Sequence, residues 1–321
     1  MCGICGIIDY SGDKSAIEFR IRQMCAQIKH RGPDHEGVYF KDTSIAVGLG
    51  HRRLSIIDLS KAGHQPMSNE DGTVWVVANG EIYNYNLLKE ELLKKGHLFK
   101  SKSDTEIILH IYEEYGKECV KFLRGMFAFA IWDEKKQVLI LARDRVGKKP
   151  LLYSYVNGVF CFASEFSALL SSNFVDKEIN NEAVHSYLTF GYVPAPMTIY
   201  KNVFKLLPAH IMILDKGKLS IEQYWQLDYS QKIDISEDEA VGEVSRLFKE
   251  AVEIRLCSDV PLGAFLSGGI DSSAVVAMMC QLSGKKVKTF SVGFEEGAYN
   301  ELQYARNIAN RFNTEHNEFI V

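Results

Sequence analysis

The sequence predicts an α+β domain, followed by the beginning of an α/β domain whose sheet is parallel. Up to about residue 218, short apolar runs alternate with turn residues, and few helical patterns lie between them. From residue 237 onward, helical and strand patterns alternate, which is typical of βαβ units. The stretch around 228–238 is polar and charged. We therefore expect domains at 1–218 and 237–321, joined by a linker at 219–236.

The first domain opens with a short, isoleucine-rich apolar segment at 3–9, which predicts a buried strand. Apolar residues recur at helical spacing from Ile17 to Ile28, so a helix is expected over 14–29, ending before the turn signal RGPD. The next apolar runs predict strands at 45–49, 54–57 and 74–78. Polar residues follow these runs, and functional sites are usually built from polar groups at such strand ends.

The second half of this domain predicts one helix and two strand pairs. Ser103 and Glu106 have the spacing of a capping box, which predicts a helix from there to about residue 115. Asn157-Gly158 is a hairpin turn signal between two apolar runs. The expected strands are 126–132 with 138–142, and 151–155 with 159–163.

The second domain reads as a helix followed by a βαβαβ unit, which predicts a parallel sheet of the nucleotide-binding type. The polar sequence SGGIDSS, at 267–273, separates the first strand from the helix after it. The expected helices are 239–255, 274–282 and 301–312, and the expected strands are 261–266, 288–293 and 315–321.

Composition excludes several classes of protein. The 321 residues carry a net charge of −4 and no basic run with interleaved aromatics, so no nucleic-acid partner is expected. No stretch of about 20 apolar residues predicts a membrane span, and the N-terminus lacks the pattern of a signal peptide. Seven scattered cysteines favour a reducing compartment, so the expected location is the cytoplasm.

Cys2 is the first candidate catalytic residue. Removal of Met1 would leave its thiol and a free α-amino group on one residue, and the amine, with a pKa of about 7.7–8.0, can act as the base for the thiol. Cys2 and Cys5 could also form a redox pair or half of a zinc site, but no second pair or Cys/His cluster completes one. The histidines, His64 and His110 among them, show no metal-ligand spacing and are expected to be structural.

The SGGIDSS segment is the second candidate site. Two glycines permit a tight turn with exposed N–H groups, and the N-terminus of the next helix adds donors and a positive dipole end. The serine hydroxyls complete a cradle suited to a phosphate. Asp271 would repel that anion unless it held Mg²⁺. The spacing differs from a Walker A loop, and no Lys-Ser/Thr pair follows.

With both motifs identified, the chain resembles the family of glutamine-hydrolysing asparagine synthetases from Cys2 to Val321. Several of the matching segments are individually specific, and all occur in one shared order. The matching segments are MCGICGI (1–7), RGPD (31–34), RLSIID (53–58), GHQPM (63–67), NGEIYN (79–84), SDTE (103–106), ARDRVGKKPLLY (142–153), FASE (162–165), GYVPAP (191–196), SGGIDSS (267–273) and FEEGAYNE (294–301).

The resemblance implies that the first domain is an N-terminal-nucleophile amidohydrolase with an αββα sandwich fold. In this family the cysteine attacks the side-chain amide of glutamine, and its own amine shuttles the proton. By position, the Asn79 side chain and the Gly80 N–H would stabilise the oxyanion, and Arg53 would bind the α-carboxylate. The α-ammonium would be held by Glu81 and Asp104. The rest of the implied glutamine site is Leu54, Ser55, Ile56 and Ile57.

The resemblance further implies that the second domain uses ATP to adenylate aspartate, which ammonia then converts to asparagine with release of AMP. Asp271 would hold Mg²⁺, and Leu266 and Val292 would contact the adenosine. The remaining implied ATP contacts are Ser267, Gly268, Gly269, Ser272 and Ser273.

The family's synthetase domain extends beyond Val321, where its aspartate pocket lies. The chain is then expected to be a fragment, or to be completed by a separate C-terminal chain. A homodimer is a further alternative for its assembly. Alone, it is expected to hydrolyse glutamine without making asparagine. The alternatives are amidation of another carboxylate, on a glycan or peptide, and a non-catalytic interaction subunit, which the intact Cys2, Arg53, Asn79 and Asp104 disfavour. A phosphoribosyl-type amidotransferase is disfavoured by SGGIDSS.

Overall fold

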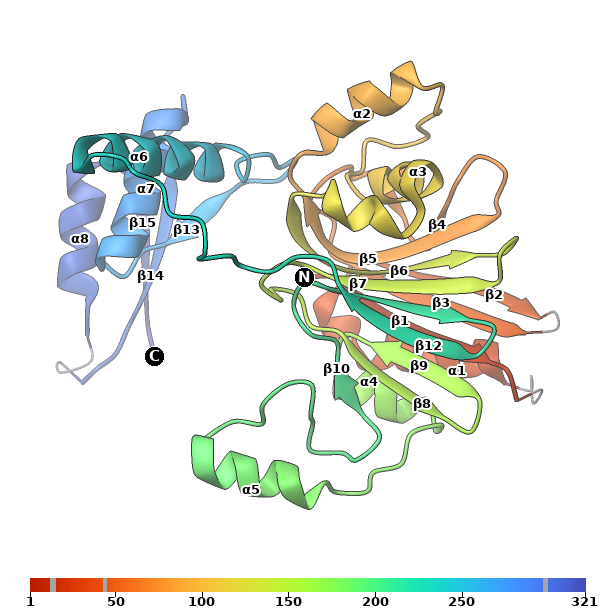
Figure 1. Cartoon of the computed structure of the whole chain (residues 1–321). Helices are drawn as coiled ribbons and strands as arrows, with labels where there is room; N and C mark the ends of the chain where they lie inside the picture. Colours follow the sequence, from red (N-terminus) through yellow and green to blue (C-terminus); the bar gives the residue numbers. More distant parts are fainter. Residues whose placement is uncertain (12–15, 43–44, 297–299) are drawn as a thin grey trace. The chain divides into compact units, whose positions relative to one another are not determined.

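The computed structural model describes residues 1–11, 16–42, 45–296 and 300–321 (Figure 1). The chain divides into two compact units, Met1–Asp228 and Tyr229–Val321. Each unit has its own sheets and core, and each is described by itself. Among the helices of the described residues, none combines the length and the apolar character needed to cross a bilayer.

The first unit contains two six-stranded antiparallel sheets. In the first sheet, β1 lies between β3 and β9, so the N-terminal strand is central and begins beside the end of β3. In spatial order, the strands of this sheet are β10 (Phe204–Lys205), β8 (Leu152–Val156), β9 (Val159–Ala163), β1 (Gly3–Asp9), β3 (Ala46–Arg53) and β2 (His35–Asp42).

The second sheet has β5 and β6 near one edge, paired over nine residues from Val74 to Ile82. Its strands in spatial order are β12 (Lys218–Gln223), β11 (His210–Asp215), β7 (Val138–Arg143), β6 (Gly125–Asp133), β5 (Val74–Ile82) and β4 (Met67–Ser68). The strand β12 therefore occupies the first residues of the segment for which the sequence predicted a linker.

The two sheets pack face to face, and helices cover both outer faces (Figure 1). In β1, Ile4 and Ile8 point into the core between the sheets, whereas Cys5 and Ile7 pack against the outer helices, as the two-residue period of a strand requires. All seven residues of β1 are buried for this reason. This arrangement confirms the predicted αββα sandwich.

Each of four helices in this unit lies on the sheet with which it shares a hydrophobic core. On the first sheet lie α1 (Ile17–Gln27) and α4 (Phe166–Ser171), and on the second lie α2 (Tyr85–Lys94) and α3 (Glu106–Tyr115). The remaining helices are α5 (Asn181–Phe190) and the 3₁₀ turns η1 (Lys29–Arg31), η2 (Lys61–Gly63) and η3 (Gly116–Lys121).

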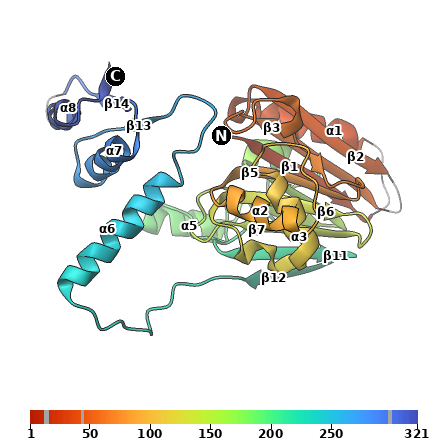
Figure 2. The ribbon, with the colours of Figure 1, turned by 90° about the horizontal axis from the view of Figure 1, so that it is seen from above.

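The second unit is built on a three-stranded parallel sheet, as the βαβαβ pattern predicted. Its core is small, and α6 packs against α7 through Val252 and Met279 (Figure 2). In spatial order the strands are β13 (Gly263–Phe265), β14 (Lys288–Gly293) and β15 (Glu315–Ile320), and the helices are α6 (Glu237–Glu253), α7 (Ile270–Leu282) and α8 (Leu302–Arg311).

Several local predictions were wrong. Residues 54–57 form an irregular loop and no strand. Ser103 does not cap α3, which begins at Glu106; the Glu106 carboxylate accepts hydrogen bonds from the N–H groups of Lys100 and Ser101, at 2.7 and 2.8 Å. The helix α7 begins at residue 270, inside SGGIDSS and not after it. The start of the helix predicted at 14–29 lies partly outside the described residues.

Candidate active site

Cys2 lies directly before β1, where the chain passes the end of β3. Its Sγ is 3.5 Å from the backbone nitrogen of Leu54, which donates to it, and 3.7 Å from the Leu54 carbonyl oxygen. Burial raises the pKa of the Cys2 thiol, while the Leu54 backbone, the nearby N-terminus and Arg53 act in the opposite direction. The thiol is therefore held at a defined place and receives partial electrostatic help toward ionisation.

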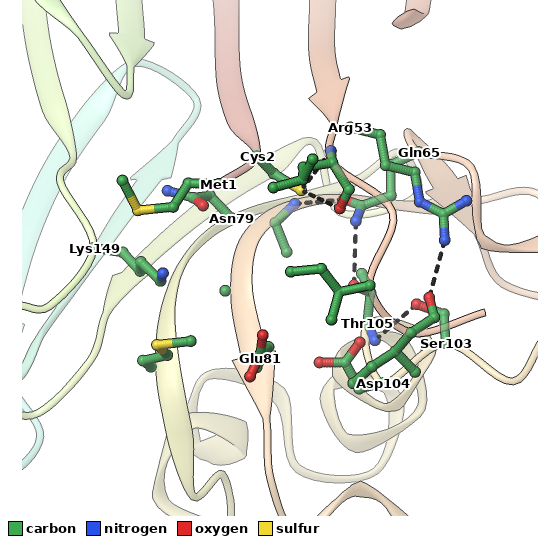
Figure 3. Close-up of a pocket in the computed structure, with 16 residues that line it drawn as sticks. Met1, Cys2, Arg53, Gln65, Asn79, Glu81, Ser103, Asp104, Thr105 and Lys149 are labelled. Atoms are coloured by element: carbon green, nitrogen blue, oxygen red, sulfur yellow. Dashed lines mark hydrogen bonds between the residues drawn. The ribbon is translucent and has the colours of Figure 1, made fainter. Parts of the chain in front are cut away.

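Asn79, on β5, connects this strand to Cys2. In the orientation that satisfies both of its neighbours, the Asn79 amide nitrogen donates to the Cys2 carbonyl oxygen at 3.0 Å, and its oxygen accepts from Arg31 Nη2 at 3.3 Å. The Arg31 Nε also donates to the Cys2 carbonyl, at 2.9 Å. Because Asn79 is buried, this amide is a fixed polar group beside the thiol (Figure 3).

Gly80 follows Asn79 at a position where only glycine fits. A Cβ atom built there would lie 2.1 Å from the carbonyl oxygen of Met126 on β6. The close approach of β5 and β6 thus requires glycine, and the Gly80 backbone lines the same pocket as Cys2.

Arg53 ends β3 and holds the next loop around the pocket. Its Nη1 donates to the carbonyl of Ser60 at 3.0 Å, and its Nη2 donates to the carbonyls of Ile57, at 3.0 Å, and Asp58. A guanidinium has five N–H donors, so these three bonds leave capacity for a ligand carboxylate. The side chain is buried, which strengthens any such interaction.

Asp104 and Glu81 bring two carboxyl groups to another side of the pocket. The Asp104 Oδ2 accepts from the backbone nitrogen of Ile82 at 2.7 Å. Burial and, to a smaller extent, the charge of Glu81 raise the pKa of Asp104 to about 6, against the lowering effect of that hydrogen bond. A cation bound between the two carboxylates would relieve this cost, so the pair is suited to an ammonium group.

These residues line one pocket of about 220 Å³ (Figure 3). Its walls come mainly from the N-terminus, the ends of β3 and β5, the 54–57 loop and the segment directly before α3. Ser55 is not among the lining residues; its N–H donates to Asp34 Oδ2 at 2.8 Å. The lining residues are Met1, Cys2, Arg53, Leu54, Ile56, Ile57, Gln65, Ala78, Asn79, Gly80, Glu81, Ser103, Asp104, Thr105, Met126 and Lys149.

Sequence reasoning missed four polar residues of this pocket: Ser103 and Thr105 on either side of Asp104, and Gln65 and Lys149. Gln65 accepts from the Ala78 N–H at 2.6 Å and donates to Thr105 Oγ1 at 3.2 Å, so it joins the segments that carry Asn79 and Asp104. Lys149 is buried, which lowers the pKa of its ammonium group. All four belong to matching motifs, SDTE, GHQPM and ARDRVGKKPLLY, and this was the only available signal.

The second unit has a pocket of about 260 Å³ beside the SGGIDSS turn. Leu266, Ser267, Ser272 and Val292 line it, as do residues of α8, whereas Gly268, Gly269 and Asp271 are not among the lining residues. Part of the FEEGAYNE motif, at 297–299, lies outside the described residues.

The turn itself is compact. Gly268 has a φ of +85°, and a Cβ there would lie 2.4 Å from Tyr304 Cβ, so the position requires glycine. The Ser267 and Ser272 hydroxyls are 3.0 Å apart, and the Gly269 N–H donates to Ser267 Oγ at 3.3 Å. Asp271 is exposed in the first turn of α7, near the positive end of the helix dipole.

Comparison with known proteins identifies both units. Residues 1–225 match the family described as a glutamine amidotransferase domain, and residues 243–321 match the family described as asparagine synthase. The chain is 42% identical to a putative glutamine-hydrolyzing asparagine synthetase 2 of Methanocaldococcus jannaschii, covering 99% of this chain and 64% of that protein. It is also 42% identical to asparagine synthetase 1 of Bacillus subtilis, over 96% and 48%. The chain thus spans about half to two thirds of these relatives.

A solved structure supports the fold. The chain resembles the glutamine phosphoribosylpyrophosphate amidotransferase of B. subtilis, with a TM-score of 0.50 and 17% identity over 99% of this chain and 65% of that one. At this level of identity the likeness concerns the fold alone, and it agrees with the αββα sandwich of the first unit.

Proposed function

Because the chain belongs to the family of glutamine-hydrolysing asparagine synthetases, we propose that it splits glutamine into glutamate and ammonia at Cys2. The observation that carries the proposal is the meeting of Cys2, Asn79, Arg53 and Asp104 in one pocket. Hydrolysis of a side-chain amide requires a nucleophile and an amide donor to the oxyanion. The amino-acid end of the substrate requires a cation for its carboxylate and an acid for its ammonium group.

In the proposed reaction, removal of Met1 frees the α-amine of Cys2. This amine takes the thiol proton as Sγ bonds to the side-chain carbonyl carbon of glutamine. The Asn79 amide and the Gly80 N–H donate to the oxyanion. The protonated amine then gives its proton to the departing nitrogen, so ammonia leaves and a thioester remains. Water, deprotonated by the same amine, releases glutamate and restores the thiol.

The amino-acid end of glutamine would bind on the other side of the pocket. Arg53 pairs with the α-carboxylate, and Glu81 with Asp104 holds the α-ammonium. Leu54, Ile56 and Ile57 pack along the side chain and exclude water from it. Ser55 contributes through the loop that its bond to Asp34 stabilises.

The test of this proposal is glutamate release by the purified chain in the absence of ATP and aspartate. We expect steady turnover of glutamine, and intact mass is expected to show a chain that lacks Met1. Turnover by a chain that retains Met1, or no turnover by a chain that begins at Cys2, would contradict the proposed roles.

For the whole protein, we propose that the ammonia amidates aspartate in a reaction that converts ATP to AMP and pyrophosphate. Leu266 and Val292 would contact the adenosine, and the turn with Ser267, Gly268, Gly269 and Ser272 would hold the phosphates. Asp271 fits a Mg²⁺ ion there, because a single carboxylate with phosphate oxygens is a common ligand set for this metal. Mg²⁺ would neutralise the phosphates when bound.

Amidation of a different carboxylate is a second candidate. The reason to keep it is that not every relative is named an asparagine synthetase: the amidase chry2 of Gibberella zeae is 37% identical over 93% of this chain and 47% of that protein. Turnover of aspartate by a full-length protein would separate the two candidates.

Replacing Arg53 by lysine is expected to raise the KM for glutamine roughly 10- to 100-fold, because an ammonium group has only three N–H donors and cannot keep the three bonds to the loop carbonyls while it binds the α-carboxylate. The rate at saturating glutamine should change little. Steady-state kinetics measure both constants. Arg52→Lys is the matched control, because Arg52 donates to Glu36 and Gly32 and does not line the pocket. Equal KM values for Arg53→Lys and the wild type would contradict the assignment.

The raised pKa of Asp104, about 6, predicts a pH dependence of stability. A buried acid whose folded pKa exceeds its unfolded value stabilises the fold below the unfolded pKa, near 4, and that contribution is lost as pH rises through 6. Asp104→Asn should therefore be more stable than the wild type above pH 6, by up to about 3 kcal/mol. The difference should vanish near pH 4.

Chemical denaturation at pH 4, 6 and 8 would measure this difference. In the wild type, the KM for glutamine should also rise below pH 6, because a neutral Asp104 no longer attracts the ammonium group of the substrate. An Asp104→Asn protein that is less stable than the wild type at pH 8 would contradict the expected burial cost.

A further inference from the structure

A second cluster of titratable groups lies on the outer side of the second sheet, apart from the glutamine pocket. It consists of Glu70, His97, His110 and Glu113, and we call it the His–Glu cluster. Each side chain offers one ligand atom, and these four atoms all lie within 4.8 Å of one another. They come from three segments: the loop between β4 and β5, the connection between α2 and α3, and α3 itself.

The distances in this cluster approach those of a metal site. The Nδ1 of His110 is 3.0 Å from Glu113 Oε2 and 3.8 Å from Glu70 Oε1. The Nδ1 of His97 is 3.6 Å from Glu113 Oε2 and 4.0 Å from Glu70 Oε1. Around a tetrahedral ion with bonds of about 2.0–2.1 Å, neighbouring donor atoms are about 3.3–3.4 Å apart. Closure around an ion would change the four distances above by about 0.3–0.7 Å, and it would also draw in the remaining pairs of ligand atoms, which lie within 4.8 Å of one another.

His97 has the outer partner found around metal-binding histidines. The Nε2 of His97 forms a hydrogen bond with Glu114 Oε1 at 3.1 Å, so a proton there leaves the lone pair on Nδ1 for the cluster. Metal-binding histidines usually have such a carboxylate partner on the second nitrogen. The Nε2 of His110 has no hydrogen-bond partner among the described residues, because Glu106 Oε1 is 3.8 Å away.

The two candidate carboxylate ligands are also held in place. Asn69 Nδ2 donates to Glu113 Oε1 at 2.7 Å, so the other oxygen of Glu113 turns toward the histidines. The Leu98 N–H donates to Glu70 Oε1 at 3.1 Å. The orientation of all four groups is thus fixed by neighbours, and His110 is almost completely buried.

We propose that the His–Glu cluster binds one divalent transition-metal ion of the zinc class. Two imidazole nitrogens and two carboxylate oxygens suit such an ion better than Mg²⁺ or Ca²⁺, which prefer oxygen ligands alone. The charge of the ion balances two carboxylates while both histidines remain neutral. The ion would tie the segment 97–105, which leads to Ser103 and Asp104 in the glutamine pocket, to α3 and to the start of β5.

A proton on His110 is the alternative to a metal ion in the His–Glu cluster. Although burial opposes it, the carboxylates of Glu106 and Glu113 raise the pKa of His110 to about 9, so a protonated His110 can hold the cluster together without a metal. A protonated His110 would agree with the structural role expected for this residue from the sequence. Direct metal binding separates the two accounts.

The experiment is a zinc titration of the chain by calorimetry, in a Cys2→Ala background that removes the thiol of the pocket. We expect one ion per chain, and a rise in melting temperature with added zinc. His97→Gln should weaken binding at least about 100-fold, and Glu114→Gln, which removes an outer partner, about 10- to 100-fold. His185→Gln is the matched control, because His185 is exposed on α5, and binding should be unchanged.

Cobalt provides a second readout. Four-coordinate Co²⁺ in the cluster should give visible absorption in the Cys2→Ala protein and none in His97→Gln. Glu70→Gln serves the same purpose if His97→Gln does not fold. The absence of saturable zinc binding would overturn the proposal, as would equal zinc affinities for His97→Gln and His185→Gln.

Discussion

Replacement of Cys2 by alanine is expected to abolish glutamate release, with a loss in kcat of at least about 10³-fold. Removal of a nucleophile eliminates the covalent route, and only binding and electrostatic help to water remain. The fold should survive, because Cys2 precedes β1 and its side chain faces the pocket rather than a core cluster. Glutamate production by wild type and mutant, with the melting temperature of each, measures the effect.

Cys5→Ala is the matched control for this change. Cys5 lies on β1, fully buried, with its Sγ 3.7 Å from that of Cys25, and it does not line the pocket. We expect this variant to lose some stability, because a small cavity forms in the core, while its kcat stays near the wild-type value. Cys2→Ser should be almost as inactive as Cys2→Ala. The α-amine is too weak a base to ionise a hydroxyl as readily as a thiol, and the neutral hydroxyl is a far poorer nucleophile. Comparable turnover by Cys2→Ala and the wild type would remove Cys2 from the chemistry.

The strands covered on both faces were predictable from the sequence, because such strands appear as continuous apolar runs. The segments at 3–9 and 159–163 are such runs, and the structure places strands there. The sequence did not predict the strands β2, β4, β10, β11 and β12. The segment 54–57 is apolar for another reason: Leu54, Ile56 and Ile57 line the pocket, so its hydrophobicity serves a cavity and does not indicate a strand.

The helix boundaries near both sites depended on interactions that no local pattern contains. Glu106 resembled the acid of a capping box, but its carboxylate satisfies the backbone of Lys100 and Ser101 in the preceding segment. In the second unit, the positive φ of Gly268 lets the chain turn early, so α7 starts within the motif. Local sequence could identify the residue types but not their partners.

The candidate site was found as far as its residues have distinctive chemistry or lie in recognisable motifs. Cys2 stood out through its place at the chain terminus, and Asn79 and Asp104 through the family resemblance. Gln65 and Lys149 also lie in matching motifs, but the motifs alone did not single them out, and they reach the pocket because distant segments pack together. The same holds for the His–Glu cluster, whose ligands come from three segments.

Replacement of Asn79 by alanine is expected to lower kcat for glutamine hydrolysis about 10²–10³-fold, with little change in KM. An oxyanion donor acts on charge that exists only in the transition state, so its loss affects the chemical step more than substrate binding. Asn84→Ala is the matched control, because in the described hydrogen bonds the Asn84 side chain contacts only the backbone of Phe122 and Arg124, and Asn84 does not line the pocket.

Asn79 also contacts the backbone of Cys2, so a misplaced nucleophile must be distinguished from a lost donor. The rate of Cys2 alkylation by iodoacetamide provides that readout, since this reaction depends on the position and ionisation of the thiol but develops no oxyanion. If Asn79 acts on the oxyanion, the variant keeps the wild-type alkylation rate while its turnover falls. If the alkylation rate falls in parallel with turnover, Asn79 positions Cys2 through its carbonyl oxygen, and the Gly80 N–H is left as the proposed donor to the oxyanion.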